Sequence, residues 1–126
     1  MAEHPNAVLA RQLNDAFMSG DMQAIEGLLA DDVIWHEIGR AEPRLGKAAL
    51  REAGPGSDGS DFEITATLHD VVANDDHAIA LVDATVTRGG KTLSYRTAEI
   101  YHIRDGKIAE RWAFSDDTAT ISAFFA

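Results

Sequence analysis

The clearest fold signal in this chain is the segment HAIALVDATVTRGGKTLSYRTAEIYHIRDGKIAERWAF, residues 77–114. Apolar and polar residues alternate along it, which is the pattern of half-buried β-strands. Gly89-Gly90 and Asp105-Gly106 interrupt the alternation, and both pairs tolerate the positive φ angles of tight hairpin turns. The segment therefore predicts three hairpin-linked strands, at 77–88, 92–104 and 107–114.

The same alternation predicts a fourth strand upstream, at 62–74, which ends in the turn Asn74-Asp75-Asp76. A stretch rich in Gly, Pro, Ser and Asp, residues 54–61, precedes this strand and predicts a loop. Downstream of the strands, residues 116–125 predict a short closing helix.

The first half of the chain is predicted to be helical. Pro5 suits the first turn of a helix, and Gly20 suits its end. Asp21 is expected to cap a second helix, whose apolar face would consist of Met22, Ile25, Leu28 and Leu29. A strand at 33–37, a turn over 39–46 and a short helix at 47–53 are expected to follow.

Helices first and hairpin-linked strands afterwards indicate an α+β fold, in which a curved antiparallel sheet packs against the N-terminal helices. The length of 126 residues fits one domain, covering 1–126. Neither βαβ alternation nor a glycine-rich turn between strand and helix is present, so a dinucleotide-binding fold is not expected.

The amino-acid composition indicates which classes of partner the protein is not expected to bind. The chain has 11 Lys and Arg against 21 Asp and Glu, a net charge of −10, and the basic residues are scattered, so nucleic acid is not an expected partner. No apolar run reaches the length of roughly 18 residues that spans a bilayer, and no signal peptide is recognisable, so we expect no membrane partner and a cytoplasmic location.

The sequence predicts neither a metal nor a cofactor. There are no cysteines, which excludes thiolate ligands and a thiol nucleophile. The histidines His36, His69, His77 and His102 show none of the short spacings typical of metal sites.

Glu99 is the first candidate for chemistry. Period-two alternation places it on one strand face with Tyr95, Thr97, Tyr101 and Ile103. A few polar groups among aromatic ones are typical of a pocket for an apolar ligand. The alternative is that Glu99 faces solvent or bridges to an arginine on a neighbouring strand.

Glu37 is the second candidate, because it ends the predicted strand at 33–37 and could reach over a cavity mouth. It could equally be a solvated loop residue. Trp35 shares its face and suits a pocket wall, whereas His36 is expected to point the opposite way.

Four short motifs carry a family resemblance over nearly the whole chain. They are Ser19-Gly20-Asp21, residues 29–33 (LADDV), residues 46–52 (GKAALRE), and residues 104–108 (RDGKI) followed by Trp112 and Phe114. Their order and spacing resemble the nuclear transport factor two-like superfamily, also called SnoaL-like. This resemblance implies a cone-shaped, cystatin-like α+β barrel and a homodimer.

Within that superfamily, residues 39–46 (GRAEPRLG) resemble the loop after the first strand of ketosteroid isomerase. The resemblance implies that Glu37 takes the position of the proton-shuttling carboxylate. It implies that Glu99 takes the position of a protonated carboxylic acid that donates to the enolate oxygen. The phenol that this enzyme carries on its first helix is Leu13 here, so Tyr95 or Tyr101 would have to supply a hydroxyl.

The expected function is therefore cofactor-independent proton transfer α to a carbonyl group of a small apolar substrate, by an isomerase or lyase type of enzyme. The residues expected to contact the substrate are Leu13, Phe17, Trp35, Tyr95, Tyr101 and Trp112. One alternative is a SnoaL-like polyketide cyclase or dehydratase that uses His36 or His102 with a carboxylate. The other is a domain without catalysis that binds a small molecule or a protein.

Overall fold

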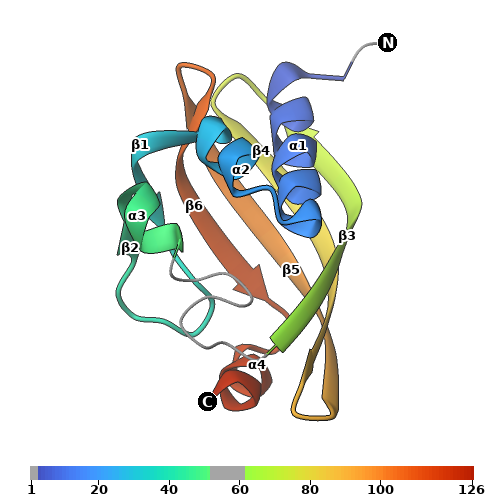
Figure 1. Ribbon diagram of the computed structural model, residues 1–126. Helices are drawn as coiled ribbons and strands as arrows, with labels where there is room; N and C mark the ends of the chain where they lie inside the picture. The colour runs from blue at the N-terminus through green and yellow to red at the C-terminus, as the bar shows by residue number, and fades with distance from the viewer. Residues whose placement is uncertain (1–2, 52–61) are drawn as a thin grey trace.

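Six strands form one curved sheet, in the order β2-β1-β6-β5-β4-β3, in the computed structural model, which describes residues 3–51 and 62–126 (Figure 1). The strands are β1 (Leu29–Trp35), β2 (Arg44–Leu45), β3 (Phe62–Ala73), β4 (His77–Arg88), β5 (Lys91–Arg104) and β6 (Lys107–Ser115). The helices are α1 (Pro5–Ser19), α2 (Met22–Leu28), α3 (Gly46–Arg51) and α4 (Thr118–Phe125). The predicted α+β class is confirmed.

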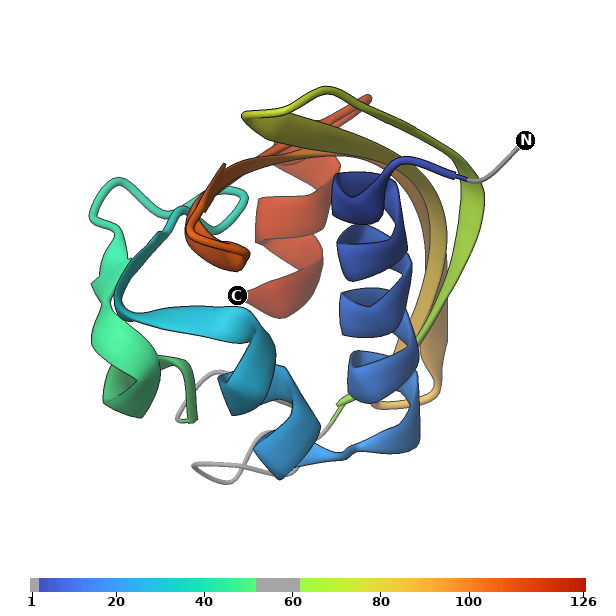
Figure 2. The ribbon, with the colours of Figure 1, turned by 90° about the horizontal axis from the view of Figure 1, so that it is seen from above.

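The sheet wraps around the N-terminal helix. Figure 2 shows β3, β4 and β5 curving around α1, which contacts β3 and β4, while α2 packs on α1 and β1. Figure 1 shows α4 at the opposite end of the strands. We call the concave side of the sheet its inner face and the convex side its outer face.

The hydrophobic core lies between α1 and the inner face. Helix and sheet both contribute fully buried side chains, which include Ala10, Leu13, Val33, Ala78, Ala80 and Ile108. Because apolar burial is the main favourable term in folding, this layer holds the helices on the sheet.

The hairpin turns form where the sequence predicts them. Gly89 and Gly90 have φ angles of 58° and 77°, and Asp105 and Gly106 have φ angles of 53° and 74°. Two successive positive φ angles are the signature of the two-residue turn that matches the twist of paired strands. At the third turn, the Asn74 side chain accepts hydrogen bonds from the backbone N–H groups of Asp76 and His77.

The first helix begins and ends as predicted; the second begins as predicted but ends at Leu28, so Leu29 belongs to β1 and not to the helix. Gly20 closes α1 in the left-handed conformation, with φ of 70°. The Asp21 side chain accepts a hydrogen bond from the Ala24 N–H and so caps α2.

The strand expected at 33–37 begins earlier and ends earlier. Leu29 leaves the helix and pairs with Ile108 of β6, and the strand ends at Trp35, so Glu37 lies in the loop that follows. This β1–β6 pairing is parallel, whereas all other neighbouring strands pair antiparallel as expected. The turn expected over 39–46 contains the two-residue strand β2.

The predicted and observed boundaries can also be compared for the third helix, the loop before β3 and the last helix. The short helix begins one residue earlier than expected, at Gly46, and residues 52–53 of the prediction lie outside the described part of the chain. The predicted loop at 54–61 also lies outside it. Helix α4 begins at Thr118, because Asp117 serves as its N-cap. Within residues 3–51 and 62–126, no helix has the length and apolar character needed to cross a membrane.

Candidate functional site

The predicted face of β5 is the inner face. Thr97, Tyr101 and Ile103 are buried there, and Tyr95 and Glu99 are half-buried. The strand therefore directs two phenols, a hydroxyl and a carboxylate toward the interior, as the period-two alternation predicts.

Glu99 lies at the centre of a polar cluster that also contains Arg111, Tyr101 and Thr97. Its Oε1 accepts hydrogen bonds from Arg111 Nη2 at 2.7 Å, from Arg111 Nε at 3.2 Å and from the Tyr101 hydroxyl at 3.3 Å. Its Oε2 accepts a bond from the Thr97 hydroxyl at 3.1 Å. The side chains of Glu99 and Arg111 keep 16% and 11% of their surface exposed, so this Glu99 cluster is largely but not completely buried.

Each of these hydrogen bonds is donated to Glu99. In these contacts the carboxyl group acts only as an acceptor, toward a guanidinium and two hydroxyls. None of these contacts uses Glu99 as a donor, so the donor role that the resemblance implies for it stays a prediction. The alternative of a bridge to an arginine on a neighbouring strand is what the structure has, since Arg111 belongs to β6.

Arg111 is the residue of this site that the sequence analysis missed. Its guanidinium carbon lies 4.5 Å from the centre of the Trp35 ring, and its Nη1 donates to the His36 carbonyl at 2.9 Å. Stacking on an aromatic face and hydrogen bonding on three sides together restrict the guanidinium to one position. Arg111 therefore connects Glu99 to the end of β1.

A bulge explains why this residue was missed. Counting back from the turn at 105–106 pairs Ile103 with Ile108, and the same count would place Arg111 opposite Ile100, on the outer face. The register shifts by one residue between His102 and Ile103, and Arg111 then pairs with Tyr101. A shift of one residue moves the side chains of a strand to the opposite face.

The same bulge corrects the placement of Trp112. The tryptophan was expected in the substrate pocket, but it pairs with Ile100 on the outer face and stacks on His36, with ring centres 5.8 Å apart and planes 8° from parallel. His36 also contacts Glu110, with Nε2 and Oε2 2.7 Å apart. His36 thus points away from the interior, as expected.

The other predicted substrate contacts lie in two environments. Trp35 is buried beneath Arg111, and the Phe17 ring lies 5.9 Å from it, with 40% of Phe17 exposed. Leu13 has no exposed surface and belongs to the core. Trp35 therefore contacts the Glu99 cluster through Arg111, Phe17 contacts Trp35, and Leu13 is part of the hydrophobic core.

Burial and charge raise the pKa of both phenols on the inner face. Desolvation raises the pKa of Tyr101 well above its usual range, and the Glu99 charge raises it further. Desolvation and the Glu99 charge also raise the pKa of Tyr95, against a smaller opposing effect of Arg111. Both hydroxyls therefore keep their protons at neutral pH and can act as hydrogen-bond donors.

Glu37 lies just past the end of β1, in the loop that approaches the cluster. Its Oε1 accepts a hydrogen bond from Arg44 Nε at 2.9 Å. Its side chain is 29% exposed, and the residue before it supplies the carbonyl that Arg111 binds. The two glutamates thus form separate ion pairs near the same end of β1.

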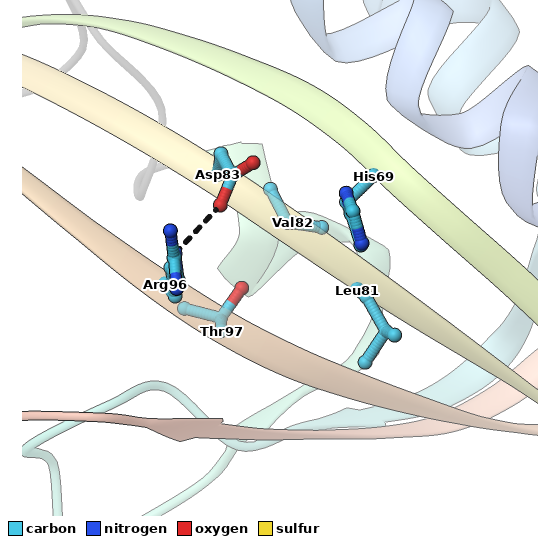
Figure 3. A pocket seen from close by; sticks show the side chains of 6 residues that line it. All are labelled: His69, Leu81, Val82, Asp83, Arg96 and Thr97. Carbon is cyan, nitrogen blue, oxygen red and sulfur yellow. Dashed lines mark ion pairs between the residues drawn. The ribbon is translucent and has the colours of Figure 1, made fainter.

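Two hollows lie along β4 and β5, and Glu99 lines neither of them. One, of about 260 Å³, is lined by His69, Leu81, Val82, Asp83, Arg96 and Thr97 (Figure 3). Asp83 and Arg96 form an ion pair across it, at 3.2 Å. The second lies beside it and shares Asp83 and Arg96. Among the residues that the structure describes, no three His, Asp or Glu side chains form a group that could hold a metal ion.

Comparisons with known proteins agree with this architecture. The SnoaL-like domain family matches residues 10–111. Bal32a, from a soil-derived mobile gene cassette, is 27% identical with a TM-score of 0.83, and the match covers 97% of each chain. A protein of unknown function with a cystatin-like fold, from Xanthomonas campestris, is 25% identical with a TM-score of 0.78, over 96% of this chain and 98% of that one.

A proposed ketosteroid isomerase from Kribbella flavida is 18% identical with a TM-score of 0.75, over 90% of this chain and 78% of that one, and this likeness shows the fold alone. No curated protein matches the sequence. The family match covers most of the chain, and the curved sheet around α1 agrees with it. The chain belongs to the SnoaL-like domain family of the nuclear transport factor two-like superfamily.

Proposed function

We propose that this protein is an acid–base enzyme that moves a proton α to the carbonyl group of a small, largely apolar substrate without a cofactor. The observation that carries the proposal is the Glu99 cluster, a set of hydrogen-bonded polar side chains on an otherwise apolar inner face. Polar side chains that are buried together and remain partly exposed are typical of ligand sites.

Glu37 is the base in this proposal. Only its Oε1 has a side-chain partner in the described part of the chain, so Oε2 is free to take a proton. Glu99 is a weaker candidate, because Arg111, Tyr101 and Thr97 already occupy its oxygens. Its role here is to hold Arg111 against Trp35 and the backbone next to Glu37.

The reaction needs one base and one hydrogen-bond donor. Glu37 removes a proton from the carbon next to the carbonyl, and the electron pair of that C–H bond moves to the oxygen, which becomes an enolate. A neutral hydroxyl of the inner face stabilises the enolate by a hydrogen bond. Glu37 then returns the proton to another carbon, which isomerises the substrate, or a leaving group departs, which is a lyase reaction.

The positions of two histidines support this chemistry over the cyclase alternative. One structural neighbour is described as a proposed ketosteroid isomerase, and its low identity supports the fold only. The cyclase alternative requires His36 or His102 in the pocket, but His36 contacts Glu110 and His102 contacts His77 on the outer face. The orientation of these imidazoles therefore favours the carboxylate mechanism.

Exchange of α-protons for deuterium tests the proposal without a known substrate. A panel of small ketones and enones, acetophenone among them, is incubated with the protein in D₂O and followed by ¹H NMR. We expect catalysed exchange for at least one compound, and a loss of about 10² to 10⁴ in rate in Glu37→Gln, the range that a single positioned base supplies.

Glu63→Gln is the matched control, since Glu63 is an exposed carboxylate on β3. It should keep the wild-type exchange rate. Equal rates in Glu37→Gln and the wild type would refute the role of Glu37, and no exchange for any compound would favour a binding domain without catalysis.

A further inference from the structure

The charges around the candidate site cancel in pairs. Arg111 directs Nε and Nη2 at Glu99 and Nη1 at the His36 carbonyl, so each of its three nitrogens has a partner. Arg44 pairs with Glu37 at the loop beside it. The two arginines beside the Glu99 cluster and Glu37, Arg111 and Arg44, therefore already have carboxylate partners.

One donor on this face remains without a partner. The Tyr101 hydroxyl donates to Glu99, and so does the Thr97 hydroxyl. Tyr95 lies on the same face, is half-buried, and forms no side-chain hydrogen bond with the described residues. A half-buried hydroxyl without a partner loses part of its hydration, and a ligand acceptor can restore that interaction.

We infer that this site selects an uncharged ligand with an acceptor oxygen, that the Tyr95 hydroxyl donates to that oxygen, and that the Glu99–Arg111 pair excludes carboxylates. The inference rests on the proposed function, because it assigns the ligand class of the same site. A carboxylate ligand would face the Glu99 charge without a counter-ion of its own, which is costly in a partly desolvated place. A carbonyl oxygen needs only the donor that Tyr95 offers.

The Tyr95 hydroxyl keeps its proton at neutral pH. Burial and the Glu99 charge both raise the pKa of this phenol, so it remains a donor at neutral pH. The same charge would disfavour an ionised ligand. The protonated Tyr95 hydroxyl and the Glu99 charge therefore both favour a ligand that carries a neutral acceptor oxygen.

Three probes that share a phenyl ring test the inference. Acetophenone has a neutral acceptor, ethylbenzene has the same shape without an acceptor, and benzoate has a charge. Binding is measured by shifts of backbone amide signals in NMR titrations. We expect acetophenone to bind about 3- to 10-fold more tightly than ethylbenzene, the usual effect of one hydrogen bond, and benzoate to bind most weakly.

Two variants separate the parts of the inference. Tyr95→Phe should remove the difference between acetophenone and ethylbenzene, whereas Ser94→Ala, which removes an exposed hydroxyl from the outer face of the same strand, should leave it in place. Glu99→Gln leaves the Arg111 charge uncompensated, so benzoate should bind at least about 10-fold more tightly to this variant than to the wild type. Thermal unfolding confirms that each variant is folded, and the Tyr95→Phe result stands by itself if Glu99→Gln does not fold.

Several outcomes would overturn the inference. The inference fails if the wild type binds benzoate most tightly of the three probes, if Tyr95→Phe still prefers acetophenone to ethylbenzene, or if no probe binds. The proposed function fails separately: selective binding of acetophenone without α-proton exchange refutes the catalysis alone. Exchange that Tyr95→Phe leaves unchanged, together with unchanged binding, refutes the assignment of Tyr95 alone.

Discussion

Glu99 and Arg111 are two opposite charges that the fold removes from water together. Each would be costly to bury alone, and the pair is tolerated because the guanidinium and two hydroxyls satisfy the carboxylate. Removing one partner leaves the other as a buried, uncompensated charge. The energetic importance of the pair is therefore seen when it is broken rather than when both charges are removed.

This argument predicts a specific pattern in stability. Glu99→Gln and Arg111→Met should each lower the free energy of unfolding by about 3 kcal/mol, and the double variant should lose clearly less than the sum. Urea denaturation at neutral pH measures the three values.

The Asp83–Arg96 pair on the outer face is the matched control, because its side chains are 52% and 79% exposed. Asp83→Asn and Arg96→Met should each change the free energy of unfolding by less than about 1 kcal/mol. Equal losses for the two pairs would contradict the view that burial makes the Glu99–Arg111 pair important.

At this scale the sequence predicts the face of a residue better than its partner. The alternation of β5 places Glu99 on the inner face, because side chains alternate locally. The partner depends on how β6 is aligned, and the bulge beside Ile103 changes that alignment by one residue. Arg111 and Trp112 therefore exchange faces relative to a simple count, and no local pattern in β6 signals it.

At the scale of elements, turns were predictable because their determinants are local. Asp105 and Gly106 take positive φ angles, and these residue types tolerate them. The start of β1 was not predictable in this way. Leu29 pairs with Ile108, 79 residues later in the chain, and that distant partner decides where the helix gives way to the strand.

The loop after β1 and helix α4 meet at one close contact. Gly39 has φ of 78°, and a Cβ on it would lie 2.2 Å from the Ser122 hydroxyl oxygen. Glycine is thus required twice, for its backbone angle and for the approach of α4. The contact joins the loop that carries Glu37 to the last helix.

Gly39→Ala should therefore destabilise the protein through strain and through a clash. Gly106→Ala is the matched control, since Gly106 has a similar φ of 74° and a Cβ on it would meet no atom within 4 Å. We expect a loss of about 1 to 2 kcal/mol for Gly106→Ala, from the left-handed backbone alone, and a larger loss for Gly39→Ala.

Ser122→Ala completes the experiment, because it removes the oxygen that the new methyl group would meet. In that background Gly39→Ala should lose no more than Gly106→Ala, as measured by thermal or urea unfolding. If Gly39→Ala and Gly106→Ala are equally stable with Ser122 present, the serine side chain rotates away without cost and the contact does not hold the loop to α4.

At the scale of the whole molecule, the outer face carries an apolar patch that no helix covers among the described residues. The patch crosses β3, β4, β5 and β6 and consists of Val72, Ile79, Leu81, Ala98, Ile100, Trp112 and Phe114. Phe114 and Val72 are 59% and 54% exposed. Contiguous apolar surface of this kind is typical of an interface.

The patch fits the homodimer that the family resemblance implies, which stays a prediction. A two-fold axis would bring the same patch of two copies together. We expect a dimer in sedimentation velocity experiments, and we expect Phe114→Asp to shift the protein toward monomer, because it introduces a charge into the contact. Thr65→Asp, an exposed position of β3 outside the patch, adds the same charge and should leave the dimer intact.

Charge gives this prediction a second, independent test. Each copy has a net charge of −10, so two copies repel each other while their apolar patches attract. Added salt screens the repulsion and leaves the apolar attraction in place, so the dimer should become tighter as the ionic strength rises. A dimer held mainly by ion pairs across its interface would weaken under the same change. Two results together would assign the contact to the apolar patch: the wild type associates more tightly as salt is added, and Phe114→Asp associates little at any salt concentration. A wild-type protein that stays monomeric at high salt would refute the prediction.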